Sequence, residues 1–377
     1  MALCYPSRVW RRRILKTIIC LSLTFFLANT FQLLNLFGRR YDTWAWDRSC
    51  HGLSPFNKAC TASRASIAPD VQIVVETSGS EPYSRLLYQL ATMLSDVPRQ
   101  NILIFSDLEE DIESFHIHDA LADVSIQERK DYPEFALYDE LQMYQQLGKD
   151  TRKLEGGWKL AKYKNMAIKR KIWKMMREAS NTLPRRKWYV FIDTDTFVEW
   201  DNILALLEHL DPRKNLYIGS PVWIPKAPFA HGGSAYVLSY SALDSLNMPG
   251  RSGREGPMHS QFGVNTTALC CGDKALAVAL KQRGIGLKGY WPMFNGEIPA
   301  TVGFGREIWC EPVLSLHHLT GTEMEDLWQW IQDWKARSMG MVCKFIFECL
   351  LVSDNPRLKL MLAKYTYLAA ISIQRFV

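Results

Sequence analysis

Short apolar runs and longer amphipathic stretches follow one another between residues 70 and 338. The apolar runs predict strands at 71–75, 101–105, 188–192, 216–220 and 314–318. The amphipathic stretches predict helices at 84–94, 165–179, 201–210, 274–283 and 322–336, and Thr322 and Glu325 fit a capping box for the last one. Strands that alternate with helices in this way predict an α/β domain with a mostly parallel central sheet.

The stretch 188–196 contains two carboxylates directly after an apolar run. Residues 188–192 are all apolar or aromatic, which predicts a short strand buried on both faces. Asp193 and Asp195 follow, and residues two apart in extended chain project to the same side. We therefore expect both carboxylates in the crevice beyond the carboxyl end of a central strand, where open α/β sheets bind ligands. A divalent cation would offset their repulsion, although a solvated turn explains the same pattern.

Two later segments carry candidate chemistry. Gly232-Gly233 lets the backbone approach a ligand closely, or simply makes a tight turn before a strand. Asp273 lies at or beside the N-cap of the helix 274–283, so its carboxylate is either a helix cap or a catalytic group.

Composition and charge narrow the class of protein. Apolar residues make up 47% of the 377 residues, which excludes wholesale disorder. The net charge is +6, and five of these positive charges lie within the first 16 residues. The remainder is nearly balanced, so we expect no nucleic-acid partner. One basic run, 159–177, is interpreted as lying largely along a solvated helix face; the alternative is that one of its lysines reaches a phosphate.

The N-terminal segment predicts a membrane anchor. Residues 17–37 contain no charged side chain, and a run of this length can span a bilayer. Basic residues are denser before this run than after it, so residues 1–16 are expected in the cytosol and the rest in the lumen. No convincing cleavage site follows, which favours an uncleaved signal anchor over a cleaved signal peptide. Residues 38–68 are then a lumenal stem, 69–338 the globular domain, and 339–377 a tail without an assigned role.

The expected lumenal part contains a single glycosylation sequon, Asn265-Thr266-Thr267, and an odd number of cysteines. In an oxidising compartment most of these cysteines should pair, and their spacing matches no zinc pattern. They are Cys50, Cys60, Cys270, Cys271, Cys310, Cys343 and Cys349.

Seven short segments occur in a characteristic order. They are Ile73-Val-Val-Glu-Thr, Phe105-Ser-Asp, Gly157-Trp-Lys-Leu, Trp188-Tyr-Val-Phe-Ile-Asp-Thr-Asp-Thr, Gly232-Gly-Ser-Ala-Tyr-Val-Leu-Ser, Cys271-Gly-Asp and Ser315-Leu-His. In this order they resemble the Fringe-like and core 1 β1,3-galactosyltransferase-like enzymes, and most closely their fungal branch. That group comprises inverting β1,3-glycosyltransferases with a GT-A fold. The resemblance implies a GT-A-like domain over roughly residues 70 to 338.

The resemblance also implies a metal centre. Asp195 matches the position that binds a manganese ion on the donor diphosphate, and Asp193 matches the first acid, which contacts the donor and the metal site. His317 matches the histidine that completes this site, with His318 as the alternative. Carboxylate oxygen together with imidazole nitrogen suits Mn²⁺ better than Ca²⁺, and Mg²⁺ is a second option.

The remaining roles concern the donor and the proton. Asp273 matches the catalytic base, which would take the proton from an acceptor hydroxyl. The positions that match donor-binding residues are Ser106, Asp107, Gly232 and Gly233. The implied enzyme is a hexosyl- or N-acetylhexosaminyltransferase in the Golgi or ER membrane. It would transfer a sugar from a UDP-sugar to a glycan or glycoprotein, with a β1,3 linkage.

Two positions depart from the family pattern, and two other interpretations stay open. Thr194 and Gly272 stand where the family usually has acids. One is a haloacid-dehalogenase-like phosphatase, whose motifs nearly fit. They need Thr or Val where Phe197 stands and an acid where Ala277 stands. A catalytically silent lumenal sugar-binding protein is the other alternative.

Overall fold

Strand β5 (Trp188–Asp193) lies at the centre of the fold, and its sequence explains this position. All of residues 188–192 are buried, as expected for a strand covered on both faces. Alternate side chains enter opposite layers, so that Tyr189 and Phe191 pack into a core that includes residues of three helices. The computed structural model describes residues 66–81, 83–178, 186–224, 228–248, 269–303 and 312–337.

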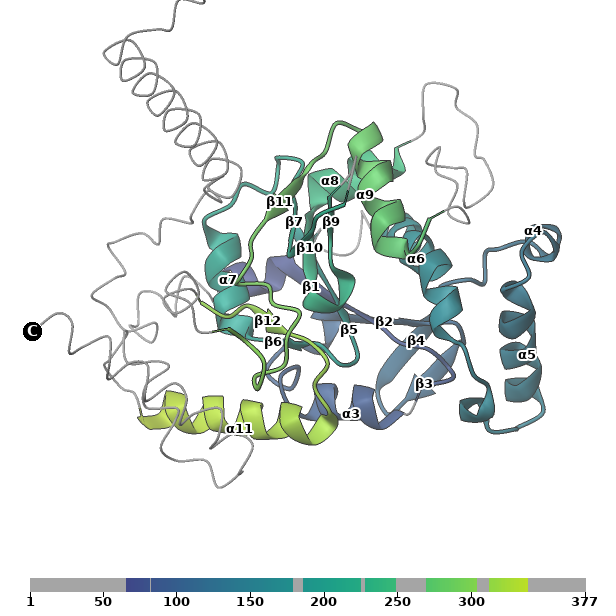
Figure 1. Ribbon diagram of the computed structural model, residues 1–377, viewed down its shortest axis with the longest axis horizontal. Coiled ribbons are helices and arrows are strands. Elements are labelled where there is room, and N and C mark those ends of the chain that lie inside the picture. Colours follow the sequence, from purple (N-terminus) through teal and green to yellow (C-terminus); the bar gives the residue numbers. More distant parts are fainter. Residues whose placement is uncertain are drawn as a thin grey trace, which may run out of the picture. The chain divides into compact units, whose positions relative to one another are not determined.

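The central sheet has the strand order β11-β7-β10-β5-β1-β2-β4-β3 (Figure 1). Only β10 and β3 run against the others in the part of the chain that is described, so the sheet is mostly parallel, as predicted. This architecture fits a GT-A-like fold. The other strands are β1 (Val71–Glu76), β2 (Ile102–Ser106), β3 (Glu110–Ile112), β4 (Phe115–Asp119), β7 (Tyr217–Gly219), β10 (Tyr236–Ser239) and β11 (Leu287–Gly289).

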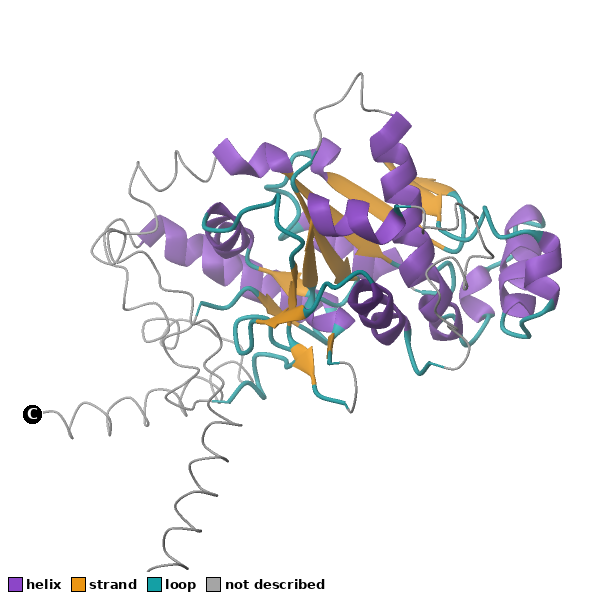
Figure 2. Cartoon of the chain, turned by 90° about the horizontal axis from the view of Figure 1, so that it is seen from above, coloured by secondary structure: helices purple, strands orange, loops and turns teal. Residues whose placement is uncertain are grey.

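Helices cover the sheet in two groups (Figures 1 and 2). Helix α6 packs against α8 and α9, and these three share the core that receives Tyr189 and Phe191. Helix α3 packs against α11, away from that core in Figure 1. The helices are α3 (Tyr83–Ala91), α4 (Ile126–Lys130), α5 (Phe135–Gln146), α6 (Trp158–Glu178), α7 (Trp200–Glu208), α8 (Tyr240–Asn247), α9 (Gly272–Gln282) and α11 (Gly321–Arg337).

Short elements complete the framework around the end of β5. Two pairs of two-residue strands form separate sheets, and the first pair connects the segment after β5 to the segment before α11. The pairs are β6 (Phe197–Val198) with β12 (Ser315–Leu316), and β8 (Pro221–Val222) with β9 (Phe229–Ala230). The 3-10 turns are η1 (Ala68–Asp70), η2 (Arg99–Asn101), η3 (Thr151–Lys153) and η5 (Gly232–Ser234).

Several predicted boundaries were wrong. Helix α6 begins at Trp158 rather than at residue 165, and the strand predicted for 314–318 is reduced to the two residues of β12. The capping box uses Thr320 and Glu323, two residues earlier than predicted: Thr320 N donates to Glu323 Oε2 at 2.9 Å, and Glu323 N donates to Thr320 Oγ1 at 3.3 Å. No element was predicted between residues 108 and 155, where the structure has two strands, β3 and β4, two helices, α4 and α5, and the turn η3.

The described residues all belong to the compact unit Ser49–Val377. None of the described helices is long and apolar enough to cross a membrane. The predicted anchor at 17–37, the stem, most of the cysteines, the sequon at Asn265 and the tail after residue 338 lie outside the described residues.

Candidate active site

Asp195 and two histidines meet at the carboxyl edge of the sheet. His317 Nε2 lies 3.1 Å from Asp195 Oδ1, and His318 Nδ1 lies 3.7 Å from Oδ2. The pairing of β6 with β12 brings these segments together, because Leu316 lies opposite Phe197. Leu319 N also donates to the backbone oxygen of Asp195, at 3.1 Å. One potential ligand atom from each of the three side chains falls within a group no wider than 4.8 Å.

The electrostatics of this group suit a cation. Burial acts to raise the pKa of Asp195, but the hydrogen bond and charge of His317, with further help from Arg85, lower it overall. The carboxylate is therefore ionised at neutral pH. His317 is buried, and its Nδ1 has no hydrogen-bond partner in the part of the chain that is described. His318 adopts a left-handed backbone with φ of 62°, a strained conformation that is concentrated at functional sites.

Asp273 lies on the other side of the same edge, near the start of α9. Its Oδ2 accepts a hydrogen bond from the backbone N–H of Gly232 at 2.9 Å, and its Oδ1 accepts one from Asn165 Nδ2 at 3.3 Å. Burial raises the pKa of Asp273, against the opposing effects of the Gly232 N–H, Lys169 and His317. The N-cap of α9 is Cys271, so the interpretation of Asp273 as the helix cap was wrong. A carboxylate with a raised pKa can accept a proton.

Gly232 and Gly233 separate the two groups of side chains. A Cβ on Gly232 would lie 2.7 Å from Asp273 Oδ1, and a Cβ on Gly233 would lie 2.7 Å from His317 Cδ2. Thr196 Oγ1 holds this turn by donating to the Gly233 carbonyl at 2.9 Å. The predicted approach of this backbone to the donor stays a prediction. In the structure, the two glycines leave room for Asp273 on one side and His317 on the other.

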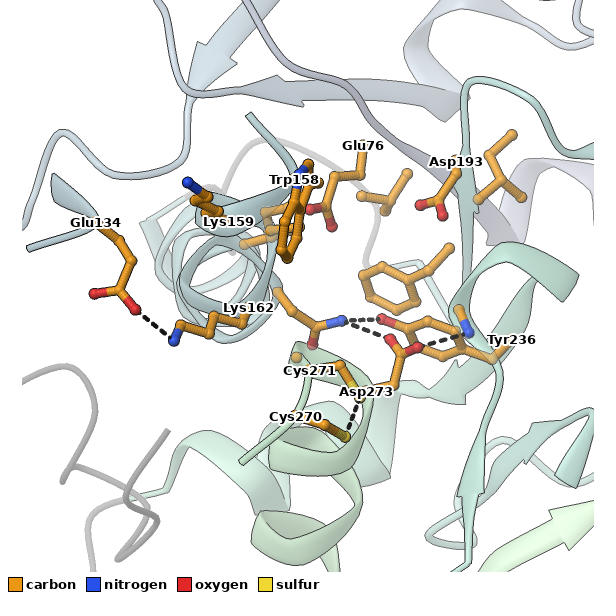
Figure 3. A pocket seen from close by; sticks show the side chains of 18 of the residues that line it. Glu76, Glu134, Trp158, Lys159, Lys162, Asp193, Tyr236, Cys270, Cys271 and Asp273 are labelled. Carbon is orange, nitrogen blue, oxygen red and sulfur yellow. Dashed lines mark hydrogen bonds and ion pairs between the residues drawn. The ribbon is translucent and has the colours of Figure 1, made fainter. Parts of the chain in front are cut away.

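A cavity of about 840 Å³ opens beside Asp273 (Figure 3). Glu76 and Asp193 line it from the ends of the adjacent strands β1 and β5, where the sheet register pairs these two residues. Burial raises the pKa of both carboxylates. Glu76 acts further to raise the pKa of Asp193, whereas Lys164 and Lys169 act to lower that of Glu76. Trp158 also lines the cavity and is 78% exposed. The cavity thus combines carboxylates with an exposed aromatic ring, a combination that suits a sugar.

The structure separates the two carboxylates of the Asp-x-Asp motif. Asp195 joins the histidines, whereas Asp193 lines the cavity and is not part of the group with His317 and His318. Thr194, between them, donates to Glu81 Oε2 at 2.8 Å. A direct metal contact by Asp193 therefore stays a prediction.

Ser106 and Asp107 are buried at the end of β2. Asp107 accepts hydrogen bonds from Gly79 N at 2.6 Å and Ser78 Oγ at 2.9 Å, and Lys164 Nζ lies 3.5 Å away. These contacts fix the loop after β1. The predicted donor-binding role of Ser106 and Asp107 stays a prediction.

Lys169 is the functional candidate that the sequence interpretation missed. It is fully buried on α6, with Nζ 4.2 Å from the ring centre of Phe191, and Nζ has no hydrogen-bond partner among the described residues. Burial lowers its pKa to about 8, although Glu76, Asp273 and Asp193 act in the opposite direction. The interpretation of 159–177 as a largely solvated basic face was wrong for Lys169 and for Lys164, which is only 2% exposed.

A signal for these buried lysines was present in the sequence. Lys164 stands four residues before Ile168, and Lys169 three residues before Ile172, so helical spacing puts both lysines close to the apolar stripe of α6. Glu76 could have been found as the charged residue that ends an otherwise largely apolar strand.

One comparison with known proteins bears on these interpretations. Residues 159–260 match the Fringe-like family model. The match supports the resemblance to Fringe-like β1,3-glycosyltransferases and indicates a glycosyltransferase. It includes Asp195 and the two glycines, while Asp273 and His317 lie beyond it. No curated protein matches the chain.

Proposed function

We propose that this protein is a metal-dependent inverting glycosyltransferase. It transfers a sugar from a UDP-sugar to a hydroxyl of a glycan or glycoprotein and forms a β1,3 linkage. The observation that carries the proposal is the position of Asp195 with its histidines on one side of Gly232-Gly233 and of Asp273 on the other. An inverting transferase needs this division, because the leaving diphosphate and the incoming hydroxyl lie on opposite faces of the sugar.

The donor set supports a resident divalent ion. Asp195 supplies a carboxylate oxygen, and His317 and His318 supply imidazole nitrogens, within a group no wider than 4.8 Å. This combination suits Mn²⁺, with Mg²⁺ as an alternative that prefers oxygen ligands more strongly. When bound, the ion would offset the negative charge of the leaving diphosphate.

Asp273 performs the proton transfer in the proposed reaction. The acceptor oxygen forms a bond to the anomeric carbon, the bond from that carbon to the diphosphate oxygen breaks, and the hydroxyl proton moves to the Asp273 carboxylate. The N–H of Gly232 holds this carboxylate in place at 2.9 Å. Lys169 places a buried positive charge behind it, which favours the ionised form needed before the reaction.

The cavity provides room for the acceptor. Trp158 presents an exposed aromatic face at its rim, and aromatic faces pack well against the apolar faces of sugar rings. The phosphatase alternative lacks support here, because it requires an acid at position 277, where Ala277 is buried in the core.

We further propose that the catalytic domain lies in the lumen of the Golgi or ER, held by a signal anchor at residues 17–37. The charge-free run and the excess of basic residues before it support this topology.

The experiment that tests the catalytic assignment is the substitution Asp273→Asn. Asparagine keeps the shape of the side chain and an oxygen for the Gly232 N–H, but it cannot accept the hydroxyl proton. We expect sugar transfer to fall about a hundredfold to ten-thousandfold, while UDP binding in the presence of Mn²⁺ is unchanged. The readouts are transfer rate, UDP calorimetry and melting temperature. A transfer rate within roughly threefold of wild type would refute the role of Asp273, since a lost general base costs at least about a hundredfold.

A further inference from the structure

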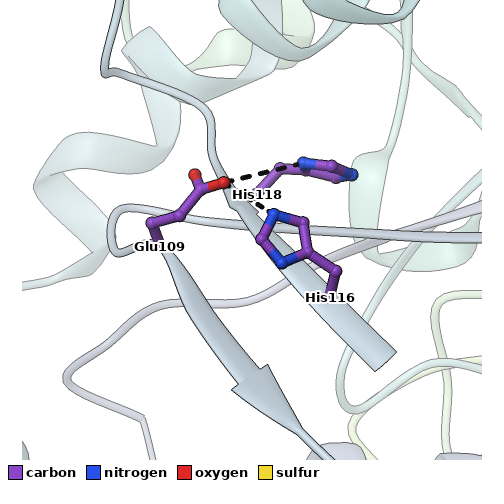
Figure 4. Close-up of side chains that lie close together, drawn as sticks. All are labelled: Glu109, His116 and His118. Atoms are coloured by element: carbon purple, nitrogen blue, oxygen red, sulfur yellow. Dashed lines mark hydrogen bonds and ion pairs between the residues drawn. The ribbon is translucent and has the colours of Figure 1, made fainter. Parts of the chain in front are cut away.

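A second group of potential metal ligands lies at the β3 side of the sheet, on the hairpin of β3 and β4 (Figure 4). His116 and His118 are two apart on β4, so their side chains project to the same side of the strand. Glu109 directly precedes β3. One ligand atom from each of these three side chains lies within a group no wider than 4.8 Å.

Glu109 is oriented toward both rings. Its Oε2 accepts a hydrogen bond from the backbone N–H of Asp119 at 2.6 Å, which fixes the carboxylate. Its Oε1 lies 2.6 Å from His116 Nε2 and 4.0 Å from His118 Nδ1. The two rings are nearly perpendicular, with their centres 4.5 Å apart. Three potential ligand atoms from two segments of the chain therefore lie close together.

The outer contacts are those of a metal-binding histidine. Asp111 Oδ1 lies 2.8 Å from His116 Nδ1, so the carboxylate orients the ring and leaves Nε2 directed at Glu109. A carboxylate on the far nitrogen is the usual partner of a histidine that binds a metal.

We propose that Glu109, His116 and His118 form a second divalent-metal site of the zinc class, with Asp111 as the residue that positions His116. Two imidazoles and one carboxylate are a known three-ligand set for zinc, with an open fourth position. The side chains of Glu109 and His116 are about half exposed, so an ion can reach the site from solvent. The bound ion would join the segment before β3 to β4 at the edge of the sheet.

A metal-free explanation also exists, and it makes a different prediction. His116 lies between two carboxylates, with Asp111 Oδ1 2.8 Å from its Nδ1 and Glu109 Oε1 2.6 Å from its Nε2. A protonated His116 could therefore simply bridge the two carboxylates, with no ion. In that case the group would bind Co²⁺ or Zn²⁺ no more tightly than any other exposed histidine does.

The test uses the full chain with Asp195→Asn, which disables the first metal centre. We expect this variant to bind one equivalent of Co²⁺ with visible absorption bands, to exchange it for Zn²⁺, and to melt at a higher temperature with Zn²⁺. Adding His118→Gln or Glu109→Gln should lower the Co²⁺ affinity at least about tenfold. His209→Gln, which replaces an exposed histidine at the end of α7, is the matched control and should change nothing.

Two results would overturn the proposal. One is an Asp195→Asn chain without Co²⁺ bands; the other is equal Co²⁺ affinity in the His118→Gln and His209→Gln variants. Far-UV circular dichroism of the metal-free variants shows whether the ligand substitutions leave the chain folded, and Glu109→Gln provides a second ligand change on the surface. The catalytic proposal is tested by UDP binding and transfer, so the two proposals can fail independently.

Discussion

Single substitutions of the two adjacent glycines should separate the loss of metal binding from the loss of the chemical step. Neither Gly232 nor Gly233 has a positive φ, so alanine fits the backbone at both positions and only its methyl group matters. At Gly233 that methyl group would lie 2.7 Å from His317 Cδ2 and closer still to Nε2 and Cε1. At Gly232 it would lie 2.7 to 3.0 Å from the carboxylate of Asp273.

The required displacement follows from these distances. Ordinary van der Waals contact begins near 3.4 Å, so Cδ2 of His317 must move by about 0.7 Å in Gly233→Ala, and the nearer atoms Nε2 and Cε1 must move further. Metal–ligand distances tolerate only about 0.2 Å. Even outer-shell changes cost about tenfold to a hundredfold in metal affinity, so we expect a Mn²⁺ affinity reduced by at least that range. UDP binding should weaken in parallel.

Gly232→Ala should act on the other side. The Asp273 carboxylate must move by several tenths of an ångström and loses its alignment with the Gly232 N–H. A misplacement approaching 1 Å can cost about a hundredfold in rate, so we expect turnover to fall by roughly that factor. Affinity for Mn²⁺ and UDP should stay within a factor of about three, since the lost contact serves the proton transfer and not the metal.

The assay compares both variants with Gly286→Ala. Gly286 also lacks a positive φ, and a methyl group there would meet nothing within 4 Å, so this control measures the effect of Gly to Ala alone. Mn²⁺-dependent UDP calorimetry, transfer rate and melting temperature are measured for all three. The reasoning fails if Gly233→Ala binds Mn²⁺ as tightly as Gly286→Ala, or if Gly232→Ala turns over at the wild-type rate.

Three further predictions concern the metal, the buried lysine and the topology. Asp195→Asn, or EDTA on the wild type, should weaken UDP binding in calorimetry; equal affinity with and without EDTA would contradict the metal centre. The pKa of Lys169 falls from 10.5 to about 8 on folding. Between pH 8 and 10.5 the unfolded chain therefore binds one more proton than the folded chain, so the free energy of unfolding should rise with pH. Urea unfolding should show this rise, up to about 3 kcal/mol, in wild type but not in Lys169→Met; parallel curves would exclude it. In microsomes, residues beyond 60 should resist protease until detergent is added, and their digestion without detergent would rule out the lumenal topology.

The sequence predicted the centre of the fold because a run such as 188–192 has few alternatives. Five consecutive buried-type residues fit a strand covered on both faces, and the acids that follow then lie at its carboxyl end. The order of strands and helices likewise limited the sheet to a mostly parallel one. The ends of helices and strands were predicted less accurately. Polar residues such as Lys159 and Lys162 at the start of α6 add little to the apolar periodicity that marks a helix.

The region 108–155 was missed because its local signal is weak and its stabilising contacts are distant. Strand β4 does alternate, since Phe115 and Ile117 take turns with His116 and His118, but five residues are a short window. Asp119 accepts from Tyr138 at 2.6 Å and from Gln142 at 3.0 Å, so side chains of α5 fix the end of β4. Such contacts depend on tertiary structure and leave no periodicity in the chain.

The site itself depends on one antiparallel strand within a mostly parallel sheet. Parallel strands β1 and β5 place their carboxyl ends, Glu76 and Asp193, side by side. Because β10 runs the other way, with Tyr236 opposite Phe191, the residues that precede β10 lie beside those that follow β5. The turn Gly232-Gly233 therefore meets the Asp-x-Asp segment at one edge, and there it contacts Asp273 from α9 and His317 from after β12. A wholly parallel β10 would place that turn at the far edge of the sheet, so the reversal of this single strand joins the proposed metal centre to the proposed base.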